Sequence, residues 1–241
     1  MPFVQEYWPQ IRDTDLDGFV GLRGGLRCFQ DVYTGFMYSL GKGNDVLPVR
    51  YGAVWVYTHC LIRMDKKLEY GAPAALSAWI EPGNQPARVL LGVTITQRGE
   101  IAARGRIDTC VFSLSERRPL RPRDIEFPDG LAEDVPNSIP PFSRLERSTE
   151  GMEKRYEKTV RFSDLDSSRH MNNLRYFEMF QDAYNSAFWA DFSAREVEIS
   201  FLSQCLEGEK LSVMSRPEGD SLRLAAVHAD GRVASVAVFR K

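Results

Sequence analysis

The chain has 241 residues, of which 43% are apolar, and this is enough for two domains that each bury a core. The formal net charge of −2 excludes the strong positive balance typical of nucleic-acid-binding proteins. No apolar run reaches membrane-spanning length, and the N-terminus lacks a basic region followed by an apolar core. The sequence therefore predicts a cytoplasmic protein with no nucleic-acid or membrane partner.

The first half is expected to open with a short strand and then a helix. The segment from Gly24 to Leu40 carries apolar residues at helical spacing, and Gly41 fits a left-handed helix end. Strands are predicted at 54–62, 74–81, 88–97 and 101–114, with a tight turn at Arg98-Gly99.

The second half repeats this order. A short strand precedes a helix whose apolar positions run from Leu174 to Phe188. Strands are predicted at 196–202, 210–215, 222–229 and 232–240, and Asp230-Gly231 is a strong hairpin turn. Residues 121–152 are rich in proline and charge and are read as a linker across the surface. The expected domains are therefore 1–120 and 153–241.

An internal repeat carries the most informative residues. Two aspartates of the first half, the run 29–31 and Tyr33 all recur at an offset of 151 positions (164 − 13), so one structural unit is expected to be used twice. Only the second copy has a histidine: Asp13, Asp15 and Phe19 correspond to Asp164, Asp166 and His170. This pattern indicates a duplicated fold with one active half.

Three segments resemble one family, the acyl-acyl carrier protein thioesterases, which are double hotdog proteins. The family motif is approximately Asp-x-Asp-x-Asn-x-His-x-Asn-Asn-x-x-Tyr. The matching segments are 164–173 with Tyr176, the strand 54–58 leading to Asp65 and Gly71, and the late strand 200–205.

The resemblance implies an α+β fold of two tandem hotdogs, each a curled antiparallel sheet around a long central helix. It also implies hydrolysis of fatty acyl thioesters on acyl carrier protein, which ends fatty acid biosynthesis by releasing free fatty acid. Catalysis is expected in the C-terminal hotdog and an acyl tunnel mainly in the N-terminal one. Two residues depart from the family: Ser168 replaces asparagine and Gln204 replaces glutamate.

His170 is the natural proton carrier near neutral pH. It precedes a predicted helix start, and the free amides near Met171, Asn172 and Asn173 could hold the carbonyl oxygen of a substrate. Asp166 could orient a catalytic partner or polarise water, or it could simply be a turn or cap residue. Ser168 could hydrogen-bond a neighbouring residue or the substrate, or it could be a residue of the turn at the helix N-terminus.

Cys205 could be a nucleophile activated by His170, or a small core residue beside the site. The second interpretation is favoured, because held water suffices for thioester hydrolysis. Gln204 could then position the water but could not take its proton. His59 and His228 are expected to be structural.

Other predicted contacts concern the substrate. Phe29, Phe36 and Met37 could line an acyl tunnel, although most apolar helix faces are simply core. A basic run could steer docking of an acidic carrier protein, or be an ordinary solvated loop. Its arginines are Arg117, Arg118, Arg121 and Arg123.

The sequence leaves two alternative functions open. The same scaffold could carry an acyl-CoA thioesterase, or a non-hydrolytic acyl-thioester binding protein in view of Ser168 and Gln204. The three histidines and four cysteines lack metal-ligand spacing, so no metal or other cofactor is expected and the cysteines are expected to be free thiols. Two hotdogs in one chain supply the pairing of single-hotdog dimers, so the protein is expected to be a monomer or a homodimer.

Overall fold

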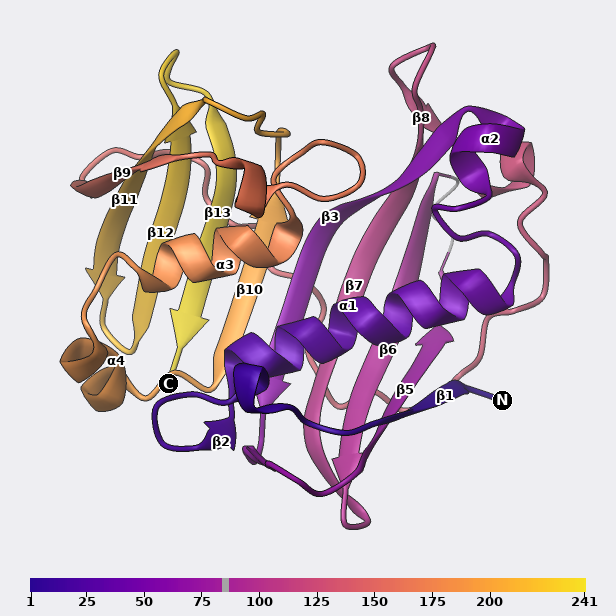
Figure 1. The fold of residues 1–241 in the computed structure, drawn as a ribbon, viewed down its shortest axis with the longest axis horizontal. Helices are drawn as coiled ribbons and strands as arrows, with labels where there is room; N and C mark the ends of the chain where they lie inside the picture. The colour runs from indigo at the N-terminus through magenta and orange to yellow at the C-terminus, as the bar shows by residue number, and fades with distance from the viewer. Residues whose placement is uncertain (84–86) are drawn as a thin grey trace. The chain divides into compact units, whose positions relative to one another are not determined.

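The computed structural model describes residues 1–83 and 87–241, which form two compact units, Met1–Pro140 and Pro141–Lys241. In each unit an antiparallel sheet carries a helix across one face (Figure 1). The α+β double hotdog fold predicted from the sequence is confirmed. Within the described ranges, no helix combines the length and apolarity needed to span a bilayer.

The sheet of the first unit has the strand order β1-β5-β6-β7-β3. Its hairpin between β6 and β7 closes at Arg98 and Gly99, which both have positive φ, as a type I′ turn requires. A small pair of β2 (Phe19–Val20) and β4 (Leu68–Glu69) lies apart, and β8 (Pro119–Leu120) pairs with β7. The main strands are β1 (Phe3–Tyr7), β3 (Ala53–Met64), β5 (Ala74–Ile80), β6 (Arg88–Gln97) and β7 (Glu100–Ser113).

The helix of the first unit is α1 (Leu22–Ser39), which packs on β5, β3 and β6. The close approach depends on Gly105 in β7, because a side chain there would collide with the Phe29 ring and the Leu61 carbonyl. Gly41 follows the helix with a φ of +63°, the left-handed conformation expected from the sequence. A short helix, α2 (Leu47–Tyr51), and two 3₁₀ turns, η1 (Ile11–Asp13) and η2 (Pro122–Ile125), complete the unit.

The sheet of the second unit has the strand order β10-β13-β12-β11-β9. Its strands alternate buried and exposed residues less strictly than a two-faced sheet would, and β12 and β13 are buried along nearly their whole length. The strands are β9 (Glu153–Thr159), β10 (Glu196–Phe201), β11 (Lys210–Glu218), β12 (Ser221–His228) and β13 (Val233–Arg240).

One sequence prediction is wrong in the second unit, where the predicted helix is two helices. α3 (Asn173–Gln181) packs on β12, and α4 (Ser186–Phe192) follows after a break. The break has a local cause, since the Asn185 side chain accepts a hydrogen bond from the Phe188 amide and so caps a new helix. The apolar periodicity continued through the break because Tyr184 stacks on Phe188 and both rings contact Trp189 edge to face.

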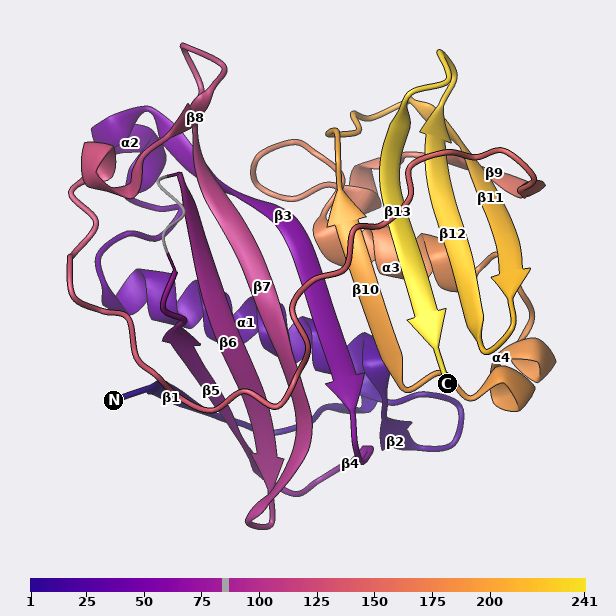
Figure 2. The same cartoon turned by 180° about the vertical axis from the view of Figure 1, so that it is seen from behind.

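After η2 the chain passes Ile80 of β5, which Ala132 bridges, and its later part lies along the sheet faces that the helices leave uncovered (Figure 2). In the first unit, Asn137 donates hydrogen bonds to Glu81 and to the Gly105 carbonyl. In the second unit, the Ser143 amide donates to the buried carboxylate of Glu198, and Leu145 packs against a cluster around Met152. The segment therefore contributes a third layer to each unit.

Candidate active site

The site begins with a buried aspartate that occurs in both units. Asp164 ends the 3₁₀ turn η3 (Phe162–Asp164), and its carboxylate accepts the Arg161 amide hydrogen bond at 2.8 Å. Asp13 ends η1 and accepts the Gln10 amide in the same way at 2.7 Å. Both carboxylates are buried. The sequence repeat is therefore a structural repeat, and the first aspartate of each motif fixes the chain before the turn that follows.

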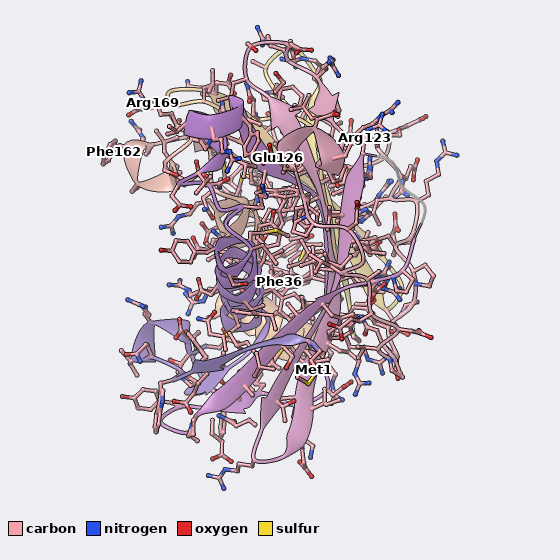
Figure 3. The ribbon with its side chains drawn as sticks, turned by 90° about the vertical axis from the view of Figure 1, so that its right-hand side faces the viewer. Met1, Phe36, Arg123, Glu126, Phe162 and Arg169 are labelled. Carbon is pink, nitrogen blue, oxygen red and sulfur yellow. The ribbon has the colours of Figure 1, made fainter. Side chains whose placement is uncertain are left out.

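The next turn has the same backbone path in both units. In the second unit the Arg169 amide donates to the Asp166 carbonyl, and the Asp166 amide donates to the His170 carbonyl, each at 3.0 Å. In the first unit the corresponding bonds are Gly18 to Asp15 at 3.0 Å and Asp15 to Phe19 at 2.7 Å. Arg169 has a φ of +63°, whereas its counterpart is a glycine. Figure 3 shows Arg169 and Phe162 projecting outward from this region.

The turn brings three predicted site residues together. The Ser168 amide and hydroxyl both donate to one carboxylate oxygen of Asp166, the amide at 2.8 Å. The same Ser168 Oγ lies 3.2 Å from His170 Nδ1. Because the single hydroxyl proton points to the carboxylate, Oγ accepts from Nδ1–H. This arrangement leaves the lone pair of His170 on Nε2, the form that a general base requires.

Solvent reaches this chain of groups. Asp166 and Ser168 are exposed, and His170 is half-buried. The corresponding turn of the first unit differs: Lys67 pairs with Asp17 at 2.6 Å and with Asp15 at 3.6 Å, and Phe19 replaces the histidine. Burial raises the pKa of Asp15, and the nearby Lys67 opposes this rise. The first turn therefore holds an ion cluster, whereas the second holds a carboxylate, a hydroxyl and an imidazole in hydrogen-bonding sequence.

The predicted oxyanion site at the start of α3 is largely wrong. The Met171 amide donates to the Cys205 carbonyl and the Asn172 amide to the Asp164 carbonyl, each at 2.9 Å. The Asn172 side chain accepts the Leu174 amide as the helix cap. These bonds occupy the amides of Met171 and Asn172, which were expected to hold the carbonyl oxygen of a substrate. Of the three expected amides, at most that of Asn173 is left. Asn172 and Asn173 are both half-buried.

Cys205 lies beside the same turn but deep in the protein. Its Sγ is fully buried, and burial raises the pKa of the Cys205 thiol to about 11. Tyr176 of α3 lies next to it, with its hydroxyl 3.4 Å from the Ser203 carbonyl. Burial also raises the pKa of Tyr176. A neutral, enclosed thiol is a poor nucleophile, so the geometry favours the core interpretation of Cys205.

Gln204 points the other way. It is exposed, and within the part of the chain that the structure describes its side-chain amide bonds to no protein group. Along an extended segment, residues two apart share a side, so Ser203 and Cys205 face inward while Gln204 faces outward. The structure therefore does not join Gln204 to the Asp166–His170 turn by a direct bond.

His228, which was expected to be structural, lies in a polar cluster that the sequence did not predict. This residue lies at the end of β12 and is 8% exposed. Its Nε2 is 2.7 Å from Ser203 Oγ and 3.9 Å from Cys205 Sγ, while its Nδ1 is 3.3 Å from a carboxylate oxygen of Glu209. No local motif could have identified this group, because pairing of distant strands brings its members together.

Cys205, Glu209 and His228 also have ligand atoms within 4.8 Å of one another, which suggests a metal site. However, Glu209 faces one ring nitrogen of His228 and Cys205 faces the other. The two nitrogen lone pairs of an imidazole diverge, so a single ion could not meet all three groups with the ring in this orientation. The cluster fits proton transfer better than metal binding.

The predicted tunnel and docking residues belong to the first unit. Phe29, Phe36 and Met37 are buried on α1, and Phe36 stacks on Phe3 with ring centroids 5.6 Å apart (Figure 3). All four arginines of the basic run are exposed. Acidic neighbours offset part of their charge: Arg118 pairs with Glu116 at 2.5 Å, and Arg123 lies 3.9 Å from Asp124.

Comparisons with known proteins bear on the family and the fold. Residues 145–235 match the family model of the acyl-ACP thioesterase C-terminal domain. A search of curated proteins finds no match. The structure resembles that of an acyl-ACP thioesterase from Bacteroides thetaiotaomicron, with a TM-score of 0.85 at 15% identity over 99% of this chain and 97% of the other.

A second similar structure is the 12:0-ACP thioesterase from Umbellularia californica, with a TM-score of 0.78 at 16% identity. The match covers 99% of this chain and 96% of that one. At these identities the structural likeness establishes the fold, while the family model covers most of the second unit. The second unit therefore matches the acyl-ACP thioesterase C-terminal domain, in agreement with the resemblance seen in the sequence, and the chain has the double hotdog fold.

Proposed function

We propose that this protein hydrolyses fatty acyl thioesters bound to acyl carrier protein and releases the free fatty acid. The observation that carries the proposal is the hydrogen-bonded chain from Asp166 through Ser168 to Nδ1 of a half-buried His170. The family match of the second unit supports thioester hydrolysis as the reaction class.

In the proposed reaction, Nε2 of His170 removes a proton from water as the water oxygen attacks the thioester carbonyl carbon. The carbon–sulfur bond of the tetrahedral intermediate then breaks, and the thiolate takes the proton from Nε2. Asp166 acts through Ser168, since its negative charge stabilises the imidazolium that forms between these steps. Water is the proposed attacking group because Cys205 is enclosed and its pKa is raised.

We propose that the acyl chain lies against the apolar side of α1 at Phe29, Phe36 and Met37, and that Asn172 and Asn173 border the reacting group. The exposed run Arg117, Arg118, Arg121 and Arg123 would attract an acidic carrier protein. An acyl-CoA thioesterase is the second candidate, because nothing in the His170 turn itself selects the carrier.

Initial rates on carrier-bound and CoA-bound acyl chains of graded length test the proposal. His170→Ala should lower the rate by about 10²–10⁴-fold, the contribution of a general base. Phe19→Ala is the matched control, because Phe19 occupies the same turn position in the first unit and should leave the rate unchanged. Cys205→Ala should retain most activity, and Gln204→Glu should raise turnover by supplying a carboxylate base.

Acyl binding without turnover in the wild-type protein, with no effect of His170→Ala, would instead identify a non-hydrolytic acyl-thioester binding protein. Equal rates on acyl chains bound to carrier protein and to CoA would favour a thioesterase that does not distinguish the two. A rate in Cys205→Ala as low as in His170→Ala would overturn attack by water.

A further inference from the structure

A second group of reactive side chains lies in the second unit and plays no part in the mechanism above. Ser203 follows β10, His228 ends β12 and Glu209 precedes β11. Ser203 Oγ is 2.7 Å from Nε2 of His228, and Glu209 Oε2 is 3.3 Å from Nδ1 of the same ring. A hydroxyl, an imidazole and a carboxylate thus follow one another in the order of a nucleophile, a base and an orienting acid.

The surroundings determine the proton positions. Glu209 Oε2 is buried, and among the described residues no hydrogen bond satisfies it. A buried carboxylate oxygen is costly to leave without a donor, so the Nδ1 proton of His228 is held on that side. Nε2 then carries the lone pair and accepts the Ser203 hydroxyl proton. The distance of 3.3 Å is long, as catalytic hydrogen bonds often are in ligand-free proteins.

Ser203 is the better nucleophile of the two groups that face Nε2. It is half-buried, whereas Cys205 is fully buried and 3.9 Å from the ring nitrogen. The backbone amide of Ser203 donates to the Ala234 carbonyl, and its own carbonyl faces the Tyr176 hydroxyl. Contacts at the amide and at the carbonyl of Ser203 therefore hold the serine in position.

We infer that Ser203, His228 and Glu209 form a second nucleophilic centre that accepts acyl groups from esters or thioesters. Ser203 Oγ attacks the carbonyl carbon while its proton passes to His228 Nε2. The bond to the leaving oxygen or sulfur breaks, the leaving group takes that proton, and an ester forms on Ser203. Water then hydrolyses this ester with His228 again as the base. The centre does not require His170.

A fluorophosphonate probe tests the inference separately from thioesterase turnover, because a serine held by a base displaces its fluoride and keeps the phosphonate. We expect one label per chain, located on Ser203 by peptide mass analysis. Ser203→Ala should abolish labelling, Glu209→Gln should slow it by about tenfold, and His228→Asn by about 10²-fold or more. His170→Ala should label at the wild-type rate, so loss of the proposed function and loss of this centre are distinguishable.

Thermal unfolding of each variant establishes that it is folded. If His228→Asn does not fold, Glu209→Gln still tests the inference, because it removes the charge with little change in volume. Folded wild-type protein that takes no label would overturn the inference. A label on Cys205 would also overturn it. So would labelling of Ser203 that is as fast in Glu209→Gln and His228→Asn as in the wild type.

Discussion

Oγ of Ser168 lies 3.2 Å from Nδ1 of His170 and donates its proton to Asp166. Serine therefore occupies the position between carboxylate and imidazole where the family motif has asparagine. A side-chain amide would present either a donor or an acceptor to the ring according to its orientation, whereas a hydroxyl that donates to the carboxylate can only accept from the ring. The substitution is compatible with a His170 that acts as a base.

Ser168→Ala should lower kcat by about tenfold, the value of one hydrogen bond of about 1.4 kcal/mol lost from the charged intermediate. KM should change little, because the bond orients the base and does not hold the substrate. Steady-state rates on acyl thioesters measure both constants. Ser168→Asn restores the family residue and should recover most of the rate; an unchanged kcat in Ser168→Ala would remove the serine from the mechanism.

Arg169→Gly should stabilise the protein by about 0.5–1 kcal/mol. Arg169 has a φ of +63°, which costs a residue with a side chain about 1–2 kcal/mol, and glycine's greater freedom in the unfolded chain offsets part of the gain. The reciprocal control is Gly18→Ala in the first unit, where a φ of +82° with open space around it predicts a loss of about 1 kcal/mol. Denaturant unfolding measures both, and opposite signs are expected.

Cys205 should weaken the fold at high pH. Burial raises its pKa from the ordinary 9.0 to about 11, so the folded state favours the neutral thiol more than the unfolded state does. This contribution is fully present below pH 9 and is lost as the pH rises from 9 to 11. Unfolding midpoints of the wild type and Cys205→Ala should therefore converge over that range. Midpoints that stay parallel would show that the thiol is not desolvated.

Gly105→Ala should destabilise the first unit by about 1–3 kcal/mol, because the added carbon would collide with the Phe29 ring and the rigid backbone at Leu61. Gly83→Ala is the control, since no atom of the described residues lies within 4 Å of the carbon that this substitution would add. Chemical denaturation of both variants measures the difference. Equal stability of the two would mean that α1 can move away from the sheet without cost.

Much of the fold could be predicted from the sequence because its determinants are local. Strand alternation, the hairpin glycines and the end of α1 at Gly41 depend on residues within a few positions of one another. The repeat also placed Asp164, Asp166 and His170 in one short turn. The turn is closed by bonds within six residues, so the sequence alone was enough to bring Asp166, Ser168 and His170 together.

Tertiary structure decided what distant strands bring together. The Met171 amide bonds to the Cys205 carbonyl, so this expected oxyanion donor is occupied, and Gln204 faces outward because its neighbours face the core. His228 meets Ser203 and Glu209 only because β10, β12 and β11 share one sheet. Sequence spacing determines which side chains lie close together within a turn. Strand pairing determines which buried donors and acceptors form hydrogen bonds with one another, and that pairing exists only in the folded sheet.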